Sequence, residues 1–175
     1  MLVILYGTSC VGKTSIEKVM IEKYNFKPVK CYVTRSVRKD DINRIQVTHN
    51  EFKKLKAKGE IKVENELYGN LYGASELDLL ESKNKDTKFI LDFSIHNYKK
   101  IIPYNPKNIV ITVDDIKSRI ELSGRHTREN EILQEYNQYY NDAKLEEYKK
   151  LGFNIVLNSF NKLDKCISSI DNTLV

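Results

Sequence analysis

The 175-residue sequence has no long apolar run, and stretches such as LVILY at residues 2–6 are far too short to span a bilayer. It also lacks the basic flank, apolar core and cleavage site of a signal peptide. Only three cysteines are present, and their scattered positions fit neither a disulfide framework nor a zinc site. We therefore expect a cytoplasmic protein with reduced thiols and no membrane partner.

Repeats, low-complexity tracts and linkers are absent too, and the length suits one domain with a substantial core. The net charge of +5 suits an anionic ligand. Lysine and arginine alternate with aspartate and glutamate, however, so no basic patch predicts nucleic-acid binding. The charge favours a small phosphate-bearing ligand. We expect no nucleic-acid partner and a monomer or homodimer.

Apolar strands alternate with amphipathic helices along most of the chain. Strands are expected at 2–6, 88–93, 108–113 and 153–158, and helices from residue 14, over 114–122, over about 128–150 and near 163–170. This order predicts an α/β fold, with a parallel sheet flanked by helices. Residues 31–72 break the rhythm and predict an inserted small subdomain.

The stretch YGTSCVGKTS at residues 6–15 carries the clearest chemistry. Gly7 to Thr14 matches G-x-x-x-x-G-K-[ST] between an apolar strand and a helix, the context of a P-loop. Such a loop surrounds phosphate with backbone N–H groups. It predicts ATP binding, with Lys13 at the β- and γ-phosphates and Thr14 on Mg²⁺. The predicted ATP-binding residues of this loop are Gly7, Thr8, Ser9, Cys10, Val11, Gly12, Lys13, Thr14 and Ser15.

Five further segments resemble the guanylate kinase-like family of P-loop nucleoside monophosphate kinases, in family order over nearly the whole chain. CYVTRSVRKDD (31–41) resembles S-x-T-T-R-x-x-R-x-x-E, and ELYGNLYGAS (66–75) resembles the segment H-G-N-x-Y-G-T-S. FILDFS (89–94) resembles the strand ending in D-x-D. SGRHTREN (123–130) is similar to the arginine-bearing lid, and NIVLNS (154–159) to the closing strand and base loop.

The resemblance implies one domain over 1–175, with a core at 1–30 and 86–175, an acceptor-binding subdomain at about 32–85 and a lid at about 123–131. It implies transfer of the ATP γ-phosphate to a nucleoside monophosphate, with GMP or dGMP as first choice. Lys13, Arg125 and Arg128 would be catalytic, Asn158 would join the ATP site, and Thr14 and Asp92 would hold the metal. The implied acceptor residues are Arg35, Arg38, Asp41, Glu64, Tyr72, Asp92 and Ser94.

Several of these residues also have simpler explanations. Arg35 and Arg38 could form a solvated loop, and Tyr72 could be a core aromatic. Asp92 could cap a helix, and Arg128 could pair with the acids that follow it. Asn158 and Ser159 could form a plain turn.

The sequence departs from the family at the base-reading positions. Cys31 replaces a serine and Ser94 replaces the second acid of D-x-D. The expected carboxylate falls on Val63, although a one-residue slip would place Glu64 there. Arg44 replaces a tyrosine. Because hydrogen-bonded pairs set specificity, these changes predict an altered base pocket beside a retained phosphate site.

Two other functions stay open at this point. YVTR, INRIQVTHNEF and GRHTREN are similar to segments of ribose 1,5-bisphosphate phosphokinase, whose acceptor has no base. Guanylate kinase-like domains also occur as catalytically silent binding modules. Those commonly lose the P-loop, whereas Gly12, Lys13 and Thr14 are in place here.

Overall fold

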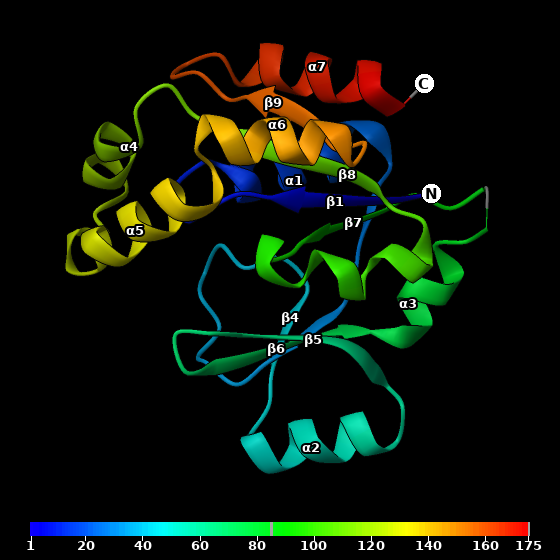
Figure 1. Ribbon diagram of the computed structural model, residues 1–175. Coiled ribbons are helices and arrows are strands. Elements are labelled where there is room, and N and C mark those ends of the chain that lie inside the picture. Colours follow the sequence, from blue (N-terminus) through cyan, green and yellow to red (C-terminus); the bar gives the residue numbers. More distant parts are fainter. Residues whose placement is uncertain (85, 175) are drawn as a thin grey trace.

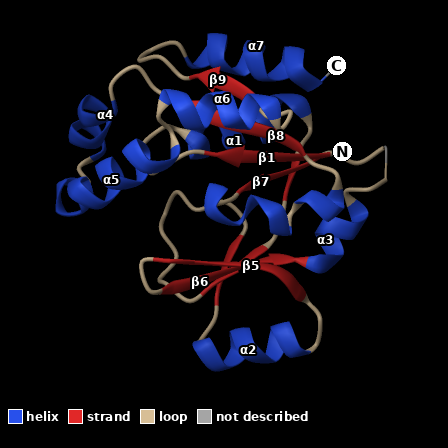
Figure 2. Ribbon diagram, viewed as in Figure 1, coloured by secondary structure: helices blue, strands red, loops and turns tan. Residues whose placement is uncertain are grey.

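The computed structural model describes residues 1–84 and 86–174, so the domain boundaries expected at 85 and 175 lie outside the described residues. Two sheets stand one above the other (Figures 1 and 2). The larger has the order β2-β7-β1-β8-β9, and all its paired strands are parallel. These strands are β2 (Lys27–Pro28), β7 (Phe89–Asp92), β1 (Leu2–Tyr6), β8 (Lys107–Thr112) and β9 (Asn154–Leu157). The predicted α/β fold is confirmed.

Both faces of this sheet are buried, which explains why β1 is apolar at every position. Leu2, Ile4 and Tyr6 belong to one core cluster, whereas Val3 and Leu5 belong to a second cluster on the opposite face. The helices that flank the sheet or lie at its end are α1 (Lys13–Tyr24), α4 (Ile116–Ser123), α5 (Glu129–Tyr139), α6 (Asp142–Lys150) and α7 (Leu163–Leu174). Among the described residues, none of the helices is long and apolar enough to cross a membrane.

The smaller sheet has the order β4-β3-β6-β5 and lies within the predicted insertion (Figure 1). Its strands are β4 (Arg44–Gln46), β3 (Cys31–Val33), β6 (Asn70–Ser75) and β5 (Ile61–Leu67), accompanied by α2 (His49–Ala57) and α3 (Glu76–Glu81). A Cβ on Gly73 would lie 2.6 Å from Ile61 and 2.8 Å from Phe52 of α2. The absence of a side chain there lets α2 pack closely on the sheet.

The single helix expected over about 128–150 is wrong, because the chain forms α5 and α6 with a break between them. Asn141 is extended (φ −73°, ψ 163°), and its side chain accepts a hydrogen bond from Lys144 N at 3.0 Å. An asparagine that caps a new helix competes with continuation of the preceding one. The helix α6 ends at Lys150 with Leu151 as its C-cap, and Gly152 follows with φ +82°. The described residues also form the short 3₁₀ helices η1 (Ile95–Lys100), η2 (Ile102–Tyr104) and η3 (His126–Arg128).

Candidate functional site

The loop between β1 and α1 has two positions where only glycine fits. A Cβ on Gly7 (φ 155°) would lie 2.7 Å from Val11 Cγ2 and 3.0 Å from a β8 carbonyl oxygen. At Gly12 (φ 91°), it would lie 2.5 Å from Asn158 Nδ2. The glycines of the motif therefore let the loop wrap tightly above the helix N-terminus, where backbone N–H groups can surround an anion.

Lys13 extends from the first turn of α1 back across this loop. Its Nζ donates to the carbonyl oxygens of Gly7 at 2.5 Å and Thr8 at 2.9 Å, and lies 3.8 Å from Asp92 Oδ1. Asp92 is the last residue of β7, the strand beside β1. The lysine charge is thus fixed where the loop, the helix and the end of the sheet meet.

Asn158 supports the loop from behind. Its Nδ2 donates to Val11 O at 2.8 Å, and its backbone N–H donates to Thr112 O at 2.8 Å. The side chain is buried and does not line the cavity between the P-loop and the smaller sheet, so the structure gives it a supporting position beside the loop. Arg119 donates to the Asn158 carbonyl oxygen and stacks 5.5 Å from the Phe160 ring. Arg119 and Phe160 line a second cavity of about 620 Å³ beside α4.

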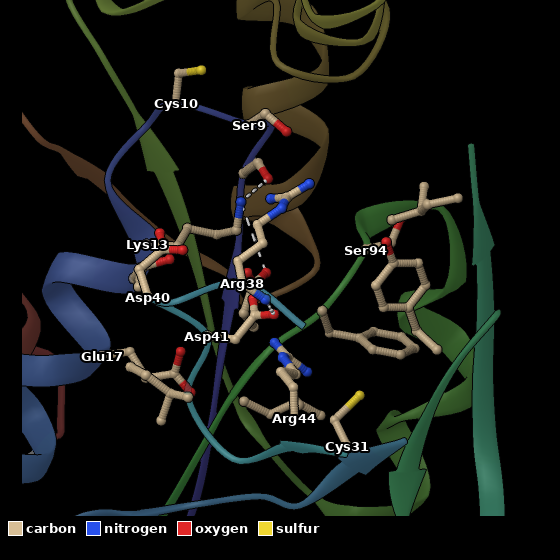
Figure 3. A pocket seen from close by; sticks show the side chains of 18 of the residues that line it. Ser9, Cys10, Lys13, Glu17, Cys31, Arg38, Asp40, Asp41, Arg44 and Ser94 are labelled. Carbon is tan, nitrogen blue, oxygen red and sulfur yellow. Dashed lines mark hydrogen bonds and ion pairs between the residues drawn. The ribbon is translucent and has the colours of Figure 1, made fainter. Parts of the chain in front are cut away.

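A cavity of about 310 Å³ lies between the P-loop and the smaller sheet (Figure 3). It joins residues that lie far apart in the sequence, from the loop, both sheets and the lid. The predicted site residues that line it are Gly7, Ser9, Cys10, Gly12, Lys13, Thr14, Ser15, Arg35, Arg38, Asp41, Tyr72, Asp92, Ser94, Arg125 and Arg128. Thr8 and Val11 are buried and do not line it, as for Asn158.

Arg35 is held by a two-point contact with Asp41. The distances are 2.6 Å from Nη1 to Oδ2 and 2.8 Å from Nη2 to Oδ1, and the guanidinium lies 5.7 Å from the centre of the Tyr72 ring. Asp41 Oδ2 also accepts the backbone N–H of Arg38 at 2.7 Å. The Asp41 hydrogen bond raises the pKa of Arg35. Burial opposes ionisation of Asp41, but Arg35 and the Arg38 N–H hold its pKa below the usual value. Asp41 thereby orients the Arg35 guanidinium and holds the backbone at Arg38.

Register across the smaller sheet decides which side chains face the cavity. Arg44, Cys31, Ala74 and Val63 are neighbours on consecutive strands and therefore share one face. Cys31, Ala74 and Arg44 line the cavity.

Glu64 is one step out of this register, beside Gly73, and its side chain faces the other way. Its carboxylate accepts a hydrogen bond from Lys56 Nζ of α2 at 2.6 Å. The expectation that Glu64 takes the place of Val63 in the acceptor site is wrong. Neighbouring residues of a strand point to opposite faces, so Glu64 points away from the cavity. Asn65 lines the cavity instead.

Two charged residues, the buried Glu17 and the half-buried Arg44, were missed as site residues. Glu17 is 4% exposed and lies one helical turn after Lys13, so both side chains are on one face of α1. Burial raises the pKa of Glu17 to about 8, against the opposing charge of Arg44. Burial opposes the charge of Arg44, but Cys31, Asp92 and Glu17 raise its pKa overall. The spacing from Lys13 could have indicated Glu17, and a charged residue on a cavity-facing strand could have indicated Arg44 (Figure 3).

Glu135 of α5 is a third missed residue. Its Oε2 accepts hydrogen bonds from Thr8 Oγ1 at 2.7 Å and Tyr68 OH at 3.0 Å, and its Oε1 lies 3.7 Å from His96 Nε2. Burial opposes ionisation, but the neighbouring His96 and the hydrogen bond from Thr8 hold the pKa of Glu135 below its ordinary value. No local pattern marks it, because it lies in a polar helix and its partners come from three other segments.

Thr14 and Asp92 offer a hydroxyl and a carboxylate oxygen to the same cavity. The described residues contain no group of three or more histidine, cysteine, aspartate or glutamate side chains that could form a metal cage. Mg²⁺ suits this donor set, since it usually takes one or two protein oxygens and completes its shell with water and substrate phosphates.

A parallel sheet with a glycine-rich loop between its first strand and first helix defines the P-loop class of α/β proteins. Within that class, the guanylate kinase family model matches residues 1–175, and the chain belongs to the guanylate kinase family. A guanylate kinase of Clostridioides difficile is 26% identical over 185 residues, which cover 98% of this chain and 89% of that protein. A guanylate kinase of Schizosaccharomyces pombe is 29% identical over 141 residues, 75% of this chain and 70% of the relative.

The fold has a counterpart among solved structures. The guanylate kinase of Anaplasma phagocytophilum superposes with a TM-score of 0.68, covering 99% of this chain and 83% of that one. The two sequences are only 19% identical, so this likeness concerns the fold alone.

Proposed function

We propose that the protein transfers the γ-phosphoryl group of ATP to the phosphate of GMP or dGMP, giving ADP and the nucleoside diphosphate. The observation that carries this proposal is the single cavity that joins Lys13 and Thr14 of the P-loop to Arg35, Arg38 and Tyr72 of the acceptor side. Two phosphate groups repel each other, and the fixed cations on both sides favour their approach. Such a reaction uses cytoplasmic nucleotides, so we place the protein in the cytoplasm.

On the donor side, the loop N–H groups would bind the β- and γ-phosphates. Lys13 would leave the loop carbonyl oxygens and contact these phosphates instead. Thr14 and Asp92 would hold Mg²⁺, which would supply positive charge that offsets the charge of the phosphates. The adenine would enter the second cavity, where Arg119 and Phe160 offer flat faces. These contacts fix the donor and leave its terminal phosphate facing the acceptor.

On the acceptor side, Arg35 and Arg38 would bind the monophosphate and Tyr72 would add its hydroxyl. An oxygen of this phosphate attacks the γ-phosphorus, a new P–O bond forms, and the bond to ADP breaks. The nucleophile is already an anion, so no protein base is needed. Arg125 and Arg128 would neutralise charge on the transferring group. The pair with Asp41 would keep Arg35 oriented throughout.

A sugar-phosphate acceptor is the second candidate, and Arg44 favours it. This half-buried cation lies in the row where a base would be read, beside Cys31 and Ala74, and that row offers no carboxylate to the N1 and N2 donors of guanine. A ribose bisphosphate would place a second phosphate group within reach of such a cation. A silent binding module is the third candidate.

A coupled assay of ATP consumption tests all three. The purified protein is offered GMP, dGMP, AMP and ribose 1,5-bisphosphate with Mg²⁺, beside the Lys13→Ala variant as background. Turnover highest with GMP or dGMP supports the proposal. A clear preference for the sugar bisphosphate supports the second candidate, and ATP binding without turnover on any acceptor supports the third.

A further inference from the structure

The tip of the β5–β6 hairpin reaches the lid. Tyr68 lies at this tip in a left-handed backbone conformation (φ 52°) and is 43% exposed. The Arg128 guanidinium lies 3.6 Å from the centre of the Tyr68 ring, and the Tyr68 hydroxyl donates to Glu135 at 3.0 Å. One side chain of the acceptor-side sheet thus contacts both η3 and α5.

Arg128 is fixed on two sides and open on a third. Its Nε donates to Glu131 Oε2 at 3.0 Å, and its flat face rests on the Tyr68 ring. Its Nη2 is buried and has no hydrogen-bond partner among the described residues, although the residue lines the cavity. A buried cationic N–H group without an acceptor is unfavourable, so this nitrogen is suited to an anion that arrives in the cavity.

Glu135 links the same tip to the P-loop. Its carboxylate accepts from Tyr68 and also from Thr8, whose carbonyl oxygen accepts from Lys13. Tyr68 is therefore held at its hydroxyl by a residue that contacts the donor loop, while its ring supports the lid arginine. The hairpin continues directly into β6, which carries Tyr72 on the acceptor side.

We propose that Tyr68 is a positioning residue for phosphoryl transfer: its ring holds Arg128 so that Nη2 points into the cavity where the transferring group passes. Arg128 therefore takes this position only when the β5–β6 hairpin contacts the lid. The inference rests on the proposed function through the role of Arg128. Stacking of an arginine on an aromatic ring fixes the plane of the guanidinium and leaves its N–H groups free to donate.

Kinetics of Tyr68→Leu and Tyr68→Phe, each with and without Arg128→Ala, test this role. Tyr68→Leu should lower kcat about tenfold while both KM values stay within about twofold, because the loss falls on the transition state. Tyr68→Phe keeps the ring and should retain kcat within about threefold. In the Arg128→Ala background, Tyr68→Leu should cause no further loss. Glu66→Ala, an exposed position on the same hairpin, serves as control.

Hydrogen exchange of residues 123–131 in the substrate-free protein supplies a readout independent of activity. Tyr68→Leu should speed exchange there relative to Tyr68→Phe, with the core strands unchanged. An equal kcat loss with and without Arg128 would overturn the proposal, as would unchanged kcat together with unchanged lid exchange. If the wild-type protein uses no acceptor, the proposed function fails, and the exchange comparison alone decides whether Tyr68 holds Arg128.

Discussion

The donor loop and the acceptor sheet are both suited to phosphate, but they are built in different ways. The loop is a run of consecutive residues whose backbone forms the anion site, and steric contacts at Gly7 and Gly12 fix its sequence. The acceptor face is assembled from side chains on separate strands. Cys31, Val63 and Arg44 occupy neighbouring positions on these strands, and the sheet still forms. Side chains at the acceptor can therefore change while the donor loop is kept.

The largest effect is expected where the donor loop depends on one side chain. Lys13→Ala should lower phosphoryl transfer about a thousandfold or more, because the lysine charge stabilises negative charge in the transition state. The fold should persist, since the glycines and Asn158 shape the loop. Turnover measured beside a melting curve checks both parts.

Lys18→Ala provides the matched control, because Lys18 is an exposed lysine on the same helix. It should leave turnover and melting unchanged. Near-normal turnover in Lys13→Ala would show that the donor loop does not depend on this side chain. It would also contradict the enzymatic proposal.

Glu17 tests the boundary between the two regions, because it belongs to α1 and faces the acceptor side. Its folded-state pKa of about 8 lies above the ordinary glutamate value of 4.5. The folded state therefore binds this proton more tightly, and the resulting stability is present below about pH 4.5 and lost as the pH rises through 8. Glu17→Gln removes this loss and should stabilise the protein by on the order of 3 kcal/mol at pH 7.

Urea unfolding at pH 5 and pH 8 measures the effect. The gain of Glu17→Gln over wild type should be small at pH 5 and largest at pH 8. Glu22→Gln, at an exposed position of the same helix, should show no such trend. A gain that is the same at both pH values would mean that the Glu17 proton is not held by burial.

The same comparison explains what the sequence could predict. The P-loop and the parallel sheet follow from short, contiguous patterns, and Arg35 and Arg38 from the family resemblance. The structure brings the P-loop and both arginines to one cavity. The break at Asn141 was missed because helical periodicity continues across it. Glu64 was misplaced because strand register depends on pairing with β6, and Glu135 was missed because its partners come from three distant segments.

Removing one of the two acceptor-side arginines should lower kcat/KM less than removing Lys13. Arg38→Ala is expected to raise the acceptor KM and lower kcat, together about 2 kcal/mol in kcat/KM, since one charged hydrogen-bonded contact is lost. Arg35→Ala should do the same and also release Asp41. The KM for ATP should stay constant in both. A fall in ATP affinity with unchanged acceptor kinetics would assign this loop to the donor.

The smallest effect is expected in base specificity, where the acceptor sheet departs most from its family. Ser94 is buried, and its hydroxyl has no hydrogen-bond partner among the described residues, while the Cys31 thiol is a weak donor. Guanine would meet no carboxylate from this row, so GMP should be accepted weakly and with poor discrimination against AMP.

Cys31→Ser combined with Ser94→Asp should improve kcat/KM for GMP over AMP by about tenfold, and no more, because Glu64 faces away and cannot supply a second carboxylate. Kinetics of both proteins on GMP, AMP and ribose 1,5-bisphosphate measure this. Strong native selectivity for GMP would show that the present row already reads the base. Unchanged GMP use in the variant, together with a native preference for the sugar bisphosphate, would mean that Arg44 faces a second phosphate and that this row reads no base at all.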